Sequence, residues 1–108
     1  MDEKAINDTN LGIIAQQMKG NDLDIRIQAA RALGYIGPLA KSTIPALIDA
    51  LHADEPQMVA QVSWSLGRMG DAAERAIPSL EEVARSNKDR SVQATAKEAI
   101  DEIKKKKK

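Results

Sequence analysis

The sequence contains no cysteine and no phenylalanine, and it has one tryptophan and one tyrosine among 108 residues. The lack of cysteine excludes disulfide bonds, thiolate metal sites and a cysteine nucleophile. No apolar run approaches the roughly 18 residues that a membrane span requires. The first residues lack the apolar run of a signal peptide. These absences predict a soluble chain that does not associate with membranes, and we expect a cytoplasmic location.

Strand signals are also scarce, because valine and threonine are few and no segment alternates apolar with polar residues over the length of a strand. We therefore expect an all-α fold. The charges balance at 16 basic and 16 acidic residues, but five of the basic ones form the run 104–108. The other 11 basic residues stand against all 16 acidic ones, so the rest of the chain carries a net charge of −5. An acidic body argues against nucleic-acid binding across the fold.

A repeat of 33 residues runs through the chain. Residues 32–37 (ALGYIG) align with 65–70 (SLGRMG), and residues 43–47 (TIPAL) align with 76–80 (AIPSL). The register predicts two whole helix pairs flanked by two half pairs, equivalent to three pairs. The six helices are expected at 10–19, 24–36, 42–52, 56–69, 74–86 and 90–105. Residues 1–9 are then a flexible N-terminal segment, 10–103 the repeat domain and 104–108 a lysine-rich tail.

Local signals support these helices. The first helix of each repeat carries an apolar stripe at three- and four-residue spacing. The stripe residues are Ile25, Ala29, Leu33 and Ile36 in one repeat, and Met58, Val62, Leu66 and Met69 in the next. Gly37 and Gly70 stand where a helix ends on a left-handed residue. Proline and aspartate mark helix starts, at Pro45, Pro56, Pro78, Asp22, Asp24, Asp54 and Asp89.

The segment 24–37 (DIRIQAARALGYIG), followed by 44–48 (IPALI), resembles the short HEAT repeat, in the variety first associated with phycobilisome bilin lyases. The resemblance extends from Leu11 to Ile103. It implies a right-handed α-α superhelix with one helix layer on the convex side and the other on the concave side, and a protein-binding role. The second repeat departs from the pattern, because Val59 replaces Arg26 and Trp64 replaces Arg31.

Residues that carry chemistry are few. His52 is the single histidine, and no cysteine or second histidine is present to complete a metal site. Its position at the end of a predicted helix suits the negative end of the helix dipole. The serines stand in no nucleophile motif, and the carboxylate pairs at 54–55 and 81–82 fall on exposed positions. We expect no catalytic residue, no metal site and no cofactor, and thus a protein that is not an enzyme.

Equivalent residues of successive repeats form rows across a solenoid. On the second helices, one row is Gln16, Asp49 and Glu82, and the neighbouring row is Lys19, His52 and Arg85. An acidic stripe therefore lies beside a basic one on the predicted concave face. A binding groove and simple matching of the basic row to the helix dipoles explain this pattern equally well.

Trp64 lies roughly 150° from the centre of the apolar stripe of its helix. An outward tryptophan is a candidate for partner contact. The register slightly favours the alternative, a ladder across the convex face in which Arg31 lies on Trp64, Tyr35 on Arg68, and Arg68 pairs with Glu102. The candidate partner-binding residues are Trp64, Asp49, His52, Glu82, Arg85 and Lys19.

The leading hypothesis is a protein-protein interaction scaffold or adaptor for a partner of unknown identity. One alternative, implied by the resemblance alone, is an accessory subunit of a bilin lyase-like enzyme. Another is nucleic-acid or anion binding, which the charge distribution disfavours outside the lysine tail. Self-association through the half pairs at the two ends, at Leu11 and Ile13 or at Ala94 and Ala96, is a further alternative.

Overall fold

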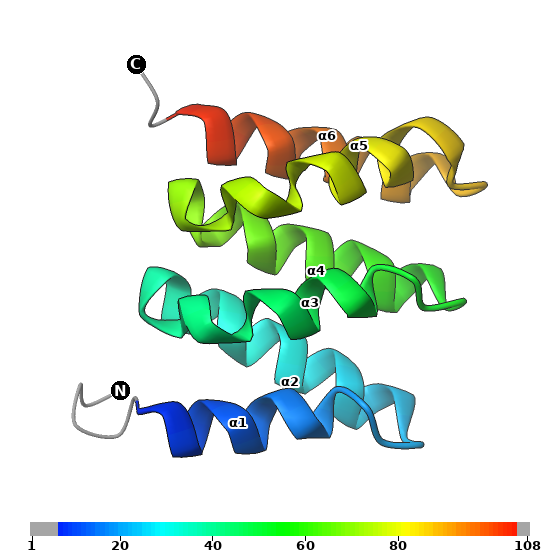
Figure 1. Cartoon of the computed structure of the whole chain (residues 1–108). Coiled ribbons are helices and arrows are strands. Elements are labelled where there is room, and N and C mark those ends of the chain that lie inside the picture. Colours follow the sequence, from blue (N-terminus) through cyan, green and yellow to red (C-terminus); the bar gives the residue numbers. More distant parts are fainter. Residues whose placement is uncertain (1–6, 106–108) are drawn as a thin grey trace.

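The structure, a computed structural model, describes residues 7–105 and consists of six α-helices stacked in two layers (Figure 1). One layer contains α1 (Asp8–Gln17), α3 (Ile44–Ala50) and α5 (Ile77–Ser86), and its outer surface is called the second-helix face below. The other contains α2 (Leu23–Ile36), α4 (Pro56–Arg68) and α6 (Arg90–Lys104), and its outer surface is the first-helix face. Residues 7–105 contain no strand, so the predicted all-α repeat fold is confirmed.

An aliphatic core lies between the two layers. Its largest fully buried side chains include Leu33, Ile44, Leu47, Met58, Leu66, Met69, Leu80 and Ile103. The predicted stripes supply half of this set, because three- and four-residue spacing turns their side chains to one side of the helix. The interpretation of Ile25 as part of the buried stripe is wrong. Ile25 is 50% exposed whereas its counterpart Met58 is 1% exposed, because no described helix precedes α2 in its layer.

The loops between first and second helices are longer and more regular than the sequence indicated. Gly37 and Gly70 end their helices with φ of +74° and +64°, as predicted. Each then opens a 3₁₀ segment, η2 (Gly37–Thr43) or η3 (Gly70–Ala76), so α3 begins at Ile44 and α5 at Ile77 instead of at 42 and 74. Pro45 and Pro78 explain the shift, because proline lacks the N–H that an earlier α-helical start would require.

Acidic and amide side chains fix the helix starts. Asp22 accepts a hydrogen bond from the Ile25 N–H, and Asp89 accepts from the N–H groups of Ser91 and Val92, as the predicted caps require. Asn7 caps α1 by accepting from the Asn10 N–H at 2.9 Å.

The two ends of the predicted domain lie close to the ends of the described part. In the N-terminal segment 1–9, Asn7 caps α1, which begins at Asp8, and residues 1–6 lie outside the described part. Of the predicted tail 104–108, Lys104 ends α6 and Lys105 pairs with Glu102 at 3.2 Å. Residues 106–108 also lie outside the described part.

Candidate functional site

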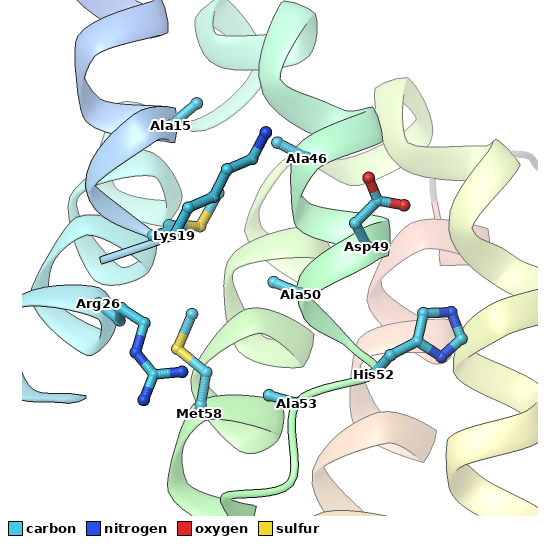
Figure 2. Close-up of a pocket in the computed structure, with 10 residues that line it drawn as sticks. Ala15, Lys19, Arg26, Ala46, Asp49, Ala50, His52, Ala53 and Met58 are labelled. Carbon is cyan, nitrogen blue, oxygen red and sulfur yellow. The ribbon is translucent and has the colours of Figure 1, made fainter. Parts of the chain in front are cut away.

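A cleft of about 280 Å³ opens on the second-helix face between α1 and α3. Its lining residues are Ala15, Met18, Lys19, Arg26, Ala46, Asp49, Ala50, His52, Ala53 and Met58. Met18 and Met58 are buried and contribute to its apolar floor. Alanine at 46, 50 and 53 leaves the space open, because these positions of α3 and the turn after it have only methyl side chains (Figure 2).

Charged groups stand at the rim of this cleft. Figure 2 shows the Lys19 ammonium extended from the end of α1 toward Ala46 on α3. Asp49 is exposed on α3. His52 lies in the turn after α3, and its ring points away from the interior of the cleft. The cleft thus combines an apolar interior with polar groups of both signs at its edge, the usual composition of a site that receives apolar side chains from a ligand.

Arg26 forms one wall of the cleft and is held by Glu55, which directly precedes α4. Its Nη1 and Nη2 donate to Glu55 Oε1 and Oε2 at 3.4 and 3.1 Å. This bonding holds the pKa of the Glu55 carboxyl below its usual value. The Arg26 Nε is buried and has no hydrogen-bond partner within the described residues. A buried donor without an acceptor costs about 1–3 kcal/mol.

A second cleft, of about 210 Å³, lies between α3 and α5. Its lining includes Leu51, His52, Ser79, Glu82, Val83, Ser86 and Asn87. His52 lines both clefts, so the two form neighbouring parts of one surface. The structure therefore brings together four of the candidate residues, namely Lys19, Asp49, His52 and Glu82.

Arg85 lines neither of these two clefts. It lines a hollow at the C-terminal end of the helix stack, together with Glu81, Ala84, Lys97 and Ile100. The prediction placed Arg85 in line with Lys19 and His52 by register alone. On α5 it borders this hollow, across from Lys97 and Ile100 of α6.

Trp64 lies on the opposite, first-helix face and is half-buried. Its ring meets Tyr35 edge-on, with centroids 5.3 Å apart and planes at 70°, and it covers Gly34. Arg31 instead donates through Nε to Gln61 at 3.2 Å, and Glu102 pairs with Lys105. The predicted ladder thus has different partners, because Gly34 leaves a space into which the indole turns. These contacts favour a packing role for Trp64, while its contact with a partner stays a prediction.

The apolar floor and the Arg26 wall are the parts of the site that the sequence analysis did not assign. The available signal was the run of alanines at 46, 50 and 53, which fall on one side of α3 and its following turn. Among residues 7–105, no group of three or more His, Cys, Asp or Glu side chains is placed to hold a metal ion. No helix in the same range is long and apolar enough to cross a membrane.

Comparison with known proteins bears on the fold and on the family. The sequence profile of HEAT repeats matches residues 12–101, from α1 to the last turns of α6. A search among curated proteins gives no match. The matched range includes the lining residues of both clefts of the second-helix face. The match shows the HEAT-repeat family, and it does not show the bilin lyase variety of the repeat.

Proposed function

Because the chain belongs to the HEAT-repeat family, we propose that it is a protein-interaction module that binds its partner across the second-helix face and has no catalytic activity of its own. One observation carries this proposal: two clefts in successive repeats of that face meet at His52. Stacked helical repeats commonly bind through an extended surface built in this way.

The chemistry of the clefts indicates the kind of segment that fits. Met18 and Met58 at the floor of the first cleft offer an adaptable apolar surface. Lys19 and Asp49 at its rim, and Glu82 in the second cleft, offer charges of both signs. A peptide segment with spaced apolar side chains, flanked by polar ones, satisfies both features.

We limit the proposal to a protein partner. The bilin lyase-like role has only the resemblance of the repeat segments in its favour. A nucleic acid would require a basic surface, whereas Arg26 is already paired with Glu55 and Lys19 shares the rim of the first cleft with the acidic Asp49. The cytoplasmic location stays a prediction from the sequence.

Charge reversal on the second-helix face tests the proposal. Wild-type protein, Asp49→Lys and Glu82→Lys are immobilised and used to capture partners from the source cell, without added substrate or cofactor. Glu98→Lys is the matched control, because Glu98 is also an exposed acid but lies on α6, on the first-helix face. We expect specific partners to be retained by the control and lost from Asp49→Lys, with affinity reduced at least about tenfold by the reversed rim charge.

Two results would contradict the proposal. Equal capture by all four proteins means that the second-helix face does not bind. Loss of capture with Trp64→Ala, together with normal capture by Asp49→Lys, moves the binding surface to the first-helix face. Far-UV circular dichroism of each variant establishes that it remains folded.

A further inference from the structure

A groove of about 320 Å³ lies between α2 and α4 on the first-helix face, in the other helix layer from the two clefts. Its lining residues are Arg31, Tyr35, Gln57, Ala60, Gln61 and Trp64. The only tryptophan and the only tyrosine of the 108-residue chain thus meet in one groove, beside an arginine. Tryptophan, tyrosine and arginine are the residue types most enriched among those that dominate protein-protein binding energies.

The fold does not require an aromatic ring at position 35. Tyr35 is 75% exposed, and its ring contact is the edge-on packing against Trp64 at 5.3 Å. Its counterparts in the next two repeats are Arg68 and Glu102, both of which are exposed. The repeat therefore accepts a charged side chain at this position. A ring held from one side by Trp64 offers contact area to a partner at a low cost in conformational entropy.

Hydrogen bonding leaves the end of the Arg31 side chain open to an acceptor. Its Nε donates to Gln61 Oε1 at 3.2 Å across the groove, and this bond also occupies the oxygen of the Gln61 amide. Nη1 and Nη2 have no hydrogen-bond or ion-pair partner among residues 7–105. These two nitrogens form the fork that binds a carboxylate through two hydrogen bonds. Arg31 lies one helical turn before Tyr35, so a ligand that reaches one side chain also reaches the other.

The charge of this groove differs from that of the corresponding groove between α4 and α6. The α4–α6 groove, of about 220 Å³, is lined by Glu98 and Glu102 beside Arg68. The lining of the α2–α4 groove within residues 7–105 includes no acid, and Arg31 is its one cation. Complementarity therefore favours an anionic ligand in the α2–α4 groove and opposes one in its neighbour. One guanidinium matches the single charge of a carboxylate, whereas a nucleic-acid backbone is held by several cations.

We propose that the α2–α4 groove binds an acidic segment of a partner protein. A Glu or Asp carboxylate of the segment accepts from Arg31 Nη1 and Nη2, and a neighbouring apolar side chain packs on the exposed ring of Tyr35. This surface is separate from the second-helix face and does not depend on binding there. A chain that uses both faces joins two proteins, which is the task of an adaptor.

Peptides selected from a random phage-displayed library on the immobilised full chain supply the probes for a test. We expect a class of peptides that share an acidic residue next to an apolar one. Fluorescence anisotropy should show that Arg31→Gln binds synthetic peptides of this class about tenfold or more weakly than the wild type, because a charge-assisted pair is lost. Replacing the acidic residue of the peptide by its amide should have a similar effect. Tyr35→Ala should weaken binding about fivefold.

Two variants outside the groove are the matched controls. Arg75→Gln removes the same charge from an exposed arginine on η3, and Leu39→Ala shortens an apolar side chain that is 55% exposed on η2. Neither residue lines the groove. Both variants should bind the peptides like the wild type. Far-UV circular dichroism establishes that each variant keeps its helices, and Arg31→Lys, which keeps the charge and loses the fork, should bind with intermediate affinity.

Three results would overturn the proposal. The first is a selection that yields no class of acidic peptides. The second is acidic peptides that Arg31→Gln binds as tightly as the wild type does. The third is equal weakening by Arg31→Gln and Arg75→Gln, which indicates general attraction by charge. Acidic peptides that are lost from Asp49→Lys and kept by Arg31→Gln also contradict the groove, and they leave binding at the second-helix face intact.

Discussion

The junction between α2 and α4 and the junction between α4 and α6 occupy the same place in successive repeats, but different side chains build them. At the first junction the Ser65 hydroxyl donates to the Ala30 carbonyl at 2.6 Å, and Trp64 covers Gly34. At the second, Gly67 lies against the backbone and methyl group of Ala99, without a hydrogen bond between the two helices at that point. Both junctions use a glycine to bring the helices close, and they differ in what fills the space around it.

The starts of the helices repeat this difference. At the first junction Arg26 reaches across to Glu55. At the second, Val59 replaces Arg26 and is buried, and Asp89, the counterpart of Glu55, caps its own helix through Ser91 and Val92. The hydrogen bonds from the Ser91 hydroxyl and from these N–H groups hold the pKa of Asp89 below its usual value. The repeat therefore keeps neighbouring helices close at both junctions, whereas the polar contacts at the helix starts differ from one junction to the next.

The largest effect should come from the core, where the two repeats are alike. Leu33 and Leu66 are both fully buried at equivalent positions. We expect Leu33→Ala and Leu66→Ala each to lower the free energy of unfolding by about 2–4 kcal/mol in urea denaturation, as buried leucine truncations do. If the two losses of unfolding free energy differ by more than about 1 kcal/mol, the two repeats are not alike in the core, and the differences between the junctions also affect the buried leucines.

An intermediate effect should separate the two glycines. A Cβ at position 34 would stand 2.6 Å from Trp64 Cζ3 and 2.9 Å from Ser65 Cα, whereas a Cβ at 67 would stand 3.1 Å from Ala99 Cα. Alanine favours a helix by up to about 1 kcal/mol over glycine, which partly offsets crowding. We expect Gly34→Ala to cost about 2 kcal/mol and Gly67→Ala less than about 1 kcal/mol.

Thermal melting of both variants measures this difference. Equal losses of stability for the two substitutions would show that the Trp64 side chain moves aside at little cost in free energy. The two junctions would then differ only in their polar contacts.

The smallest effect should come from the ion pair. The pKa of Glu55 is lowered in the folded protein, so the pair stabilises the fold above the usual glutamate pKa of 4.5, and this contribution is lost as the pH falls through the lowered value. Glu55→Gln should therefore melt at a lower temperature than the wild type at neutral pH. The difference should vanish in acid. Glu98→Gln, an exposed acid outside the pair, controls for the loss of a surface carboxylate.

Register in the sequence was enough to predict the six helices, the positive-φ glycines and the core position of Leu33. It failed where a residue lacks the neighbour that the repeat implies. Ile25 fits the stripe pattern, yet it is exposed because α2 has no described predecessor in its layer. The start of α3 was placed at 42 instead of 44, because the sequence analysis did not foresee that the 3₁₀ segment η2 extends to Thr43.

The candidate site was predicted in part. Lys19, Asp49, His52 and Glu82 were assigned to one surface, since rows of equivalent residues follow from the register. The apolar floor depends on how closely α1 approaches α3, and the contacts of Trp64 depend on a rotamer. Neither quantity is encoded in the spacing of residue types.

The placement of Trp64 has a spectroscopic consequence. It is the only tryptophan in the chain, so the indole fluorescence comes from one ring wedged between α2 and α4. Opening of that junction exposes the ring to water and shifts its emission, whereas far-UV circular dichroism averages over all the helices. If the melting curves from the two signals superimpose, the helix stack unfolds in one cooperative transition. If they separate, the repeats unfold in sequence from one end. The chain thus carries its own reporter of cooperativity between repeats, and no label is required.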